Sequence, residues 1–184
     1  MKKIILFKSI LFSIAMFSIS LLQSCKKDTP PTPDDQELIT TVQLKFTSPT
    51  GAVSSFEWKD IDGAGGKEPE IDTIKLNQNL LYNLDIAFID DSKNPPENIT
   101  TEIKEEKTAH LVLVTVTNAL NWVITSLDKD ENNKPLGLTQ TVQTSQASNG
   151  VLNLVLLHQS DKNAADPSKT GETDIEVTLP VVVK

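Results

Sequence analysis

The sequence predicts an all-β domain, an antiparallel immunoglobulin-like β-sandwich of about seven to nine strands with one short helix. Three observations lead to this prediction. Apolar and polar residues alternate along several segments, as they do on strands with one buried face. Turn residues separate these segments, as at Asn94-Pro95-Pro96 and Asn149-Gly150. The segments are short and closely spaced, which favours a sandwich over a sheet with crossover helices.

The first half of the domain shows the clearest alternation. Every second residue is apolar in the segments 40–47 and 82–90, so each segment places its apolar residues on one face of a strand. These residues are Val42, Leu44 and Phe46 in the first segment, and Leu84, Ile86 and Phe88 in the second. Weaker strands are expected between them, at 53–60 and 71–76.

The second half begins with the one expected helix. Pro95 and Pro96 precede the stretch ENITTEIKEEKTA, residues 97–109, whose charged residues lack strand alternation. The segments that follow are rich in β-branched and apolar residues, and Leu152, Leu154 and Leu156 form a row on one face. We expect strands at 110–118, 121–127, 137–144, 151–159 and 174–183.

The first 24 residues have the pattern of a bacterial lipoprotein signal peptide. Lys2 and Lys3 precede an apolar stretch from Ile4 to Leu22, which is also long enough to raise the alternative of a transmembrane anchor. The stretch ends in Leu-Gln-Ser-Cys, which matches the lipobox, in which the cysteine is acylated and becomes the new N-terminus. Cys25 is the only cysteine in the chain and has no disulfide partner. We expect Cys25 to carry a diacylglyceryl group and an N-acyl chain such as palmitate, which anchor the protein in the membrane.

Residues 25–37 predict a tether between the lipid and the domain, which spans 38–184. The tether is rich in proline and acidic residues, so it cannot bury enough apolar surface to fold. Charged residues directly after a lipidated cysteine resemble the surface-export signal of Bacteroidota lipoproteins, and Lys26, Lys27 and Asp28 follow Cys25 here. Attachment to the outer membrane is expected, facing the periplasm or the cell surface.

The charge and the motifs exclude several functions. Removal of residues 1–24 takes away three of the 17 lysines and none of the 25 acidic residues, so the net charge changes from −8 to −11. The chain has no arginine. A binder of nucleic acid needs positive charge to neutralise phosphates, so we expect no nucleic-acid partner. The sequence also lacks the G-x-S-x-G, P-loop and dinucleotide motifs, and we expect no enzymatic activity.

Several motifs together resemble one family. They are FEWKDIDGAGGKEPEID, NPPENITTEIKEEKTAH, KPLGLTQT, LLHQSDKN and TGETDIEVTLPVVV, which lie in this order between residues 56 and 183. They are similar to small Bacteroidota envelope lipoproteins of unknown activity, which are often named "type 1 periplasmic binding fold superfamily" proteins. The resemblance implies an envelope lipoprotein with a β-rich domain, and it implies no reaction.

The two histidines of the chain are candidate metal ligands. If residues 97–109 are helical, Glu106 and His110 lie four residues apart on one face, a spacing that can hold a metal ion. His158 ends the row of buried leucines and could complete a site of two histidines and a carboxylate. The alternative is that Glu106 and His110 are neighbours on a solvated helix end and that His158 caps the core.

Two acidic loops are candidate cation sites. Asp60 and Asp62 occupy the first and third positions of a calcium-binding loop, and Asp128, Asp130 and Asn132 occupy the first, third and fifth positions of another. Both loops lack the glutamate expected at the twelfth position. Acidic hairpin tips without an ion are the alternative for both.

These features predict a cell-envelope lipoprotein that acts as a non-catalytic binding module. Its ligand would be a divalent metal, zinc or calcium, or another small ligand, captured for an outer-membrane importer. The alternative is a structural or accessory envelope protein that contacts another protein and binds no small ligand.

Overall fold

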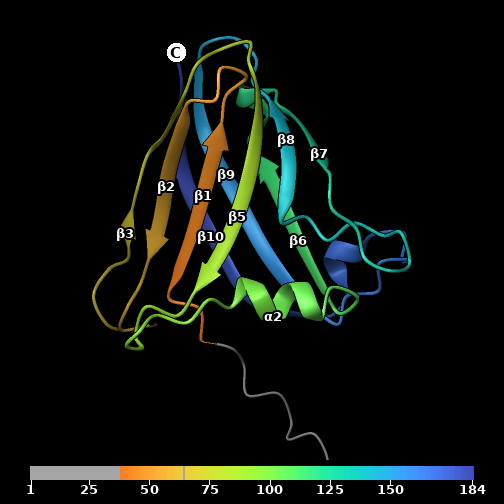
Figure 1. Ribbon diagram of the computed structural model, residues 1–184. Helices are drawn as coiled ribbons and strands as arrows, with labels where there is room; N and C mark the ends of the chain where they lie inside the picture. The colour runs from red at the N-terminus through yellow and green to blue at the C-terminus, as the bar shows by residue number, and fades with distance from the viewer. Residues whose placement is uncertain (1–37, 64) are drawn as a thin grey trace, which may run out of the picture. The chain divides into compact units, whose positions relative to one another are not determined.

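The computed structural model describes residues 38–63 and 65–184, which form two packed β-sheets (Figure 1). The larger sheet has six strands in the order β3-β2-β1-β5-β8-β7, and the smaller has four in the order β4-β10-β9-β6. Among the described residues there is one short α-helix, α2 (Thr100–Glu105), which lies at one end of the two sheets (Figure 1). The predicted all-β sandwich with one short helix is confirmed.

The strands differ greatly in length. The first five are β1 (Thr41–Thr47), β2 (Val53–Lys59), β3 (Glu70–Ile71), β4 (Ile74–Leu76) and β5 (Leu81–Ile89). After α2 (Thr100–Glu105) come β6 (His110–Val116), the 3-10 helix η1 (Asn118–Leu120), β7 (Val123–Ser126), β8 (Thr139–Gln143), β9 (Ser148–His158), the 3-10 helix η2 (Pro167–Lys169) and β10 (Glu172–Val183). The two long strands β9 and β10 form the centre of the smaller sheet.

The core consists of the apolar strand faces that the alternation of the sequence predicts. On β1, which pairs with both β2 and β5, the side chains of Val42, Leu44 and Phe46 have no exposed surface. The same is true of the leucine row on β9, which faces them from the smaller sheet. Further core side chains come from β5, β8 and β10, among them Leu84, Ile86, Phe88, Val142, Val177, Leu179, Val181 and Val183.

The prediction of a single strand at 71–76 is wrong, because this segment is divided between the two sheets. The backbone N–H of Asp72 donates to the carbonyl of Glu57, and the N–H of Glu57 donates to the Asp72 carboxylate, at 2.9 and 3.0 Å. These bonds hold the chain against β2 before it crosses to the other sheet. There β4 pairs with residues 181–183 of β10 in parallel. Strand periodicity does not show such a change of sheet.

Asn149-Gly150 is not a turn, because both residues belong to β9 and pair with β10. A Cβ atom on Gly150 would collide with the hydroxyl of Thr117 and with Leu120 of η1. The glycine therefore allows η1 to pack closely on the strand.

The helix is shorter than predicted. Two backbone hydrogen bonds pair Asp90 with Glu97 just after the end of β5. Residue 97 is therefore not helical, and the helix begins only at Thr100. The Thr100 hydroxyl donates to the carbonyl of Phe88 and accepts from its N–H, at 3.1 and 2.8 Å, which docks the helix on β5. Ile103 is fully buried beneath it. The helix ends at Glu105, and β6 begins at His110.

Cys25, the signal peptide and the tether lie outside the described residues. Within residues 38–63 and 65–184, no helix is long and apolar enough to cross a bilayer.

Candidate metal centre

Two strand ends bring the two histidines together. His110 is the first residue of β6 and His158 is the last residue of β9, and they are direct cross-strand partners. The N–H of Gln159 donates to the carbonyl of Ala109 at 2.7 Å. This bond flanks the histidine pair, so the pair is of the non-hydrogen-bonded type, in which side chains approach most closely.

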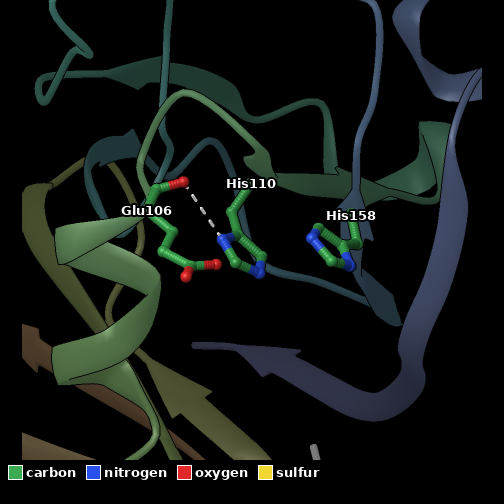
Figure 2. Close-up of side chains that lie close together, drawn as sticks. All are labelled: Glu106, His110 and His158. Atoms are coloured by element: carbon green, nitrogen blue, oxygen red, sulfur yellow. Dashed lines mark hydrogen bonds between the residues drawn. The ribbon is translucent and has the colours of Figure 1, made fainter. Parts of the chain in front are cut away.

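Glu106 completes a group of three candidate ligands. One ligand atom from each of Glu106, His110 and His158 lies within 4.8 Å of the other two (Figure 2). The imidazole rings are stacked, with centroids 4.7 Å apart and planes 6° from parallel. His110 is buried, His158 is half-buried and Glu106 is exposed, so the cluster opens to solvent on the Glu106 side.

A turn, and not a helical face, places Glu106 beside His110. The expectation that both lie on one helix is wrong, because residues 106–109 form a turn between α2 and β6. The four-residue spacing still matters, since Nδ1 of His110 lies 3.2 Å from the backbone carbonyl oxygen of Glu106. A carbonyl oxygen only accepts hydrogen bonds, so Nδ1 carries the proton. Nε2 of neutral His110 therefore has the lone pair that a metal ion requires.

Asp174 is a nearby carboxylate that the sequence patterns did not single out. A register shift between Thr173 and Ile175 makes Asp174 the extra residue of a β-bulge in β10. Its Oδ2 lies 4.0 Å from Nε2 of His110, and its side chain is 9% exposed. Without the bulge, alternation assigns residue 174 to the outer face opposite Val177 and Leu179. Only the register of the folded sheet places it inside.

The environment of His110 favours its neutral form. Burial lowers the pKa of His110, and the nearby His158 lowers it further. The Glu106 carbonyl and the carboxylates of Asp174 and Glu106 act in the opposite direction, but the net pKa is below the usual value. Metal binding requires neutral imidazole, so this shift keeps His110 ready to bind near neutral pH.

The cluster matches the chemistry of a transition-metal site but needs a small rearrangement. Zinc bonds of about 2.0–2.2 Å in a tetrahedron place ligand atoms about 3.3 Å apart, closer than the upper limit of 4.8 Å here. Imidazole lone pairs lie in the ring plane, so an ion shared by two nearly parallel rings requires one ring to rotate. His158 is the more exposed of the two rings. The backbone of His158 is closely packed, because a Cβ atom on Gly171 would collide with the His158 carbonyl.

The first acidic loop uses its carboxylates to close turns. Oδ1 of Asp60 accepts a hydrogen bond from the N–H of Gly63, and Oδ2 of Asp62 accepts one from the N–H of Lys67, each at 3.0 Å. Each of these bonds uses one oxygen of its carboxylate to close a turn of the loop.

The second acidic loop is more fully satisfied. The two oxygens of Asp128 accept from the N–H groups of Gly137 and Leu138, at 2.9 and 3.0 Å. Oδ1 of Asp130 accepts from the N–H groups of Asn132 and Lys134, both at 2.9 Å. The carboxylates that would bind an ion are already bound to the protein itself.

No family model, no curated protein and no solved structure matches this chain. The resemblance to Bacteroidota lipoproteins therefore stays a prediction.

Proposed function

We propose that the protein is a lipid-anchored protein of the cell envelope whose β-sandwich binds a divalent metal ion, with zinc as the best match, at Glu106, His110 and His158. The observation that carries the metal proposal is the convergence of these three side chains, which come from one turn and two strand ends, to within 4.8 Å. A binding module of this kind captures its ion and delivers it to an outer-membrane importer.

The choice of zinc over calcium rests on the ligand types. Two imidazole nitrogens suit zinc and similar transition metals, whereas calcium takes six to eight oxygen ligands. The carboxylates of Glu106 and Asp174 balance the charge of a divalent ion, and charge balance is what makes a partly buried ion tolerable. The sandwich adds a rigid support, since both histidines sit on paired strands.

The anchor half of the proposal rests on Cys25 and its flanking sequence. Acylation of Cys25 should make the full chain partition into the detergent phase of a phase-separation assay, because two or more acyl chains give stable anchoring. Cys25→Ser should move the protein to the aqueous phase or leave it unprocessed. Full membrane retention of Cys25→Ser would contradict lipidation and support a transmembrane anchor.

The metal half predicts a pH-dependent response to zinc. A bound ion stabilises the fold by about 2.7 kcal/mol at a hundredfold excess over its Kd, which corresponds to a rise in melting temperature of roughly 5–10 °C. At pH 5.5 the rise should be much smaller, because protons compete for the imidazole nitrogens. The measurement is thermal unfolding of the untagged full chain in detergent, with and without zinc, at pH 7.5 and 5.5.

Variants separate the cluster from adventitious binding. His158→Ala and Glu106→Gln should reduce or abolish the rise, whereas Glu105→Gln, an equally exposed neighbour, should keep it. Calcium should give no rise. A melting temperature that ignores zinc at both pH values would overturn the metal site and favour the alternative, a structural envelope protein in which the histidine pair only packs.

A further inference from the structure

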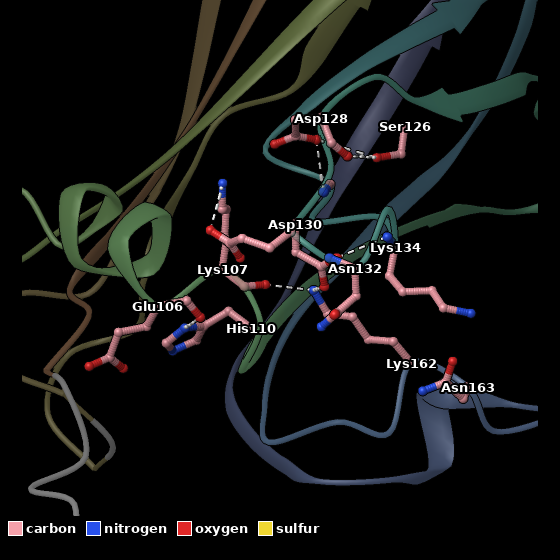
Figure 3. Close-up of polar contacts among 12 residues, drawn as sticks. Glu106, Lys107, His110, Ser126, Asp128, Asp130, Asn132, Lys134, Lys162 and Asn163 are labelled. Carbon is pink, nitrogen blue, oxygen red and sulfur yellow. Dashed lines mark hydrogen bonds and ion pairs between the residues drawn. The ribbon is translucent and has the colours of Figure 1, made fainter.

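A buried ion pair contacts the turn that carries Glu106. Nζ of Lys162 is 3.1 Å from Oδ2 of Asp130, and the two side chains are only 5% and 1% exposed. Nζ of Lys162 also donates to the backbone carbonyl of Lys107 at 2.6 Å (Figure 3). We name these three groups the Lys162 clasp: the Lys162 ammonium, the Asp130 carboxylate and the Lys107 carbonyl.

The clasp joins three segments that are distant in sequence. Asp130 belongs to the loop 127–138 between β7 and β8, and Lys162 belongs to the loop 159–171 between β9 and β10. Lys107 belongs to the turn 106–109. The turn is also tied on its surface side, where Nζ of Lys107 lies 2.9 Å from the Glu131 carboxylate.

The turn held by the clasp is the one that positions the metal ligands. Lys107 directly follows Glu106, and the turn leads into His110, whose ring donates to the Glu106 carbonyl. Movement of Glu106 or His110 toward a shared ion therefore acts on the turn 106–109, whose backbone Lys162 holds at the Lys107 carbonyl. Two sites that share one short rigid segment are coupled, and such coupling acts equally in both directions.

We propose that the Lys162 clasp couples the metal centre to the loop 127–138, so that the clasp sets metal affinity and a bound ion rigidifies the loop. Lys162 is thus a positioning residue and no ligand. This inference rests on the proposed metal site. The loop 127–138 has exposed residues on the outside of the sandwich, so a partner that contacts this loop can sense whether an ion is bound.

The first test measures zinc affinity by competition with a chelating dye, using the untagged full chain in detergent. Lys162→Met should bind zinc about tenfold more weakly, a loss typical of groups that orient ligands without touching the metal. Lys169→Met removes the same charge from the same loop at an exposed position and should bind like the wild type. Equal affinity of Lys162→Met and the wild type would overturn the inference.

The second test follows the coupling itself by hydrogen exchange. Zinc should slow exchange of the Asn132 and Lys134 amides, which Asp130 holds, in the wild type and in Lys169→Met. In Lys162→Met, these two amides should exchange at the same rate without zinc and at a saturating zinc concentration. Zinc protection that persists without Lys162 would overturn the coupling.

A double variant separates positioning from folding stability. Replacement of a buried ion pair by uncharged residues often restores stability, and an asparagine keeps an oxygen that can accept from the Asn132 and Lys134 N–H groups, so Lys162→Met with Asp130→Asn should melt closer to the wild type than Lys162→Met alone. Its zinc affinity should stay about tenfold weaker, because the tie to the Lys107 carbonyl is still missing. Recovery of zinc affinity together with stability would show that the clasp only stabilises the fold and does not position the metal ligands. Failure of the wild type to bind zinc would instead overturn the metal site itself, and the coupling with it.

Discussion

The metal cluster and the loop 127–138 lie side by side and both concentrate polar side chains, but these side chains are engaged differently. In the loop, both oxygens of Asp128 and one oxygen of Asp130 accept backbone hydrogen bonds, and Lys162 neutralises the other Asp130 oxygen. In the cluster, the His110 ring uses Nδ1 for the Glu106 carbonyl and keeps Nε2 directed at a carboxylate 4.0 Å away.

The difference shows what separates a structural polar group from a binding group. A buried carboxylate that accepts several backbone N–H groups replaces the water it lost on folding and stabilises the loop. The Nε2 lone pair of His110 lies beyond hydrogen-bonding distance of the Asp174 carboxylate, so this contact gives the fold less and leaves the nitrogen with coordination capacity for a ligand. A count of acidic residues cannot reveal this distinction, because the backbone around them decides it.

The largest expected effect is a loss of unfolding free energy, which we compare for one carboxylate from each region. Asp128→Ala leaves the buried N–H groups of Gly137 and Leu138 without their acceptor, so it should lower the free energy of unfolding by about 3 kcal/mol. Glu106→Ala removes an exposed side chain and should change the free energy of unfolding by less than about 0.5 kcal/mol in metal-free protein. Urea unfolding in the presence of EDTA measures both. Equal losses would remove the distinction between the two regions.

The fold could be predicted in most of its parts from the sequence, because burial on one face of a strand leaves a period of two. This is why Val42, Leu44 and Phe46, and the leucine row of β9, were correctly assigned to the core. The period fails where long-range pairing decides. The split of 71–76 between two sheets depends on bonds between Asp72 and Glu57, which no local pattern contains.

The residues of the candidate cluster could be predicted from the sequence, but the way in which the fold brings them together could not. The sequence points to His110, Glu106 and His158, because the chain has only two histidines and one of them follows a glutamate by four residues. The structure brings them together through a turn and a cross-strand pair. Asp174 could not be found, because a β-bulge moves a residue between faces without changing the sequence pattern around it.

The smaller expected effect concerns the pH at which each region loses stability. The pKa of His110 is lower in the folded protein than its ordinary value of about 6.5, so the unfolded chain binds the proton first as the pH falls. Stability should therefore decline as the pH drops below about 6.5. For Asp130, burial alone would raise the pKa, but hydrogen bonds from the Lys134 and Asn132 N–H groups and the pairing with Lys162 hold it below the ordinary value. Its contribution is complete above about pH 3.9 and is lost only below that value.

The two regions thus predict two separate pH windows. Melting temperatures in EDTA should fall between pH 7 and 5.5 in the wild type, and this fall should be smaller in His110→Gln, whose side chain does not titrate. Asp130→Asn should lower the melting temperature throughout but leave the slope in this window unchanged, because Asp130 stays ionised across it in the wild type. An unchanged slope in His110→Gln would show that the histidine is not held in its neutral form. A slope altered by Asp130→Asn would show that the charge of Asp130 affects the pKa of His110.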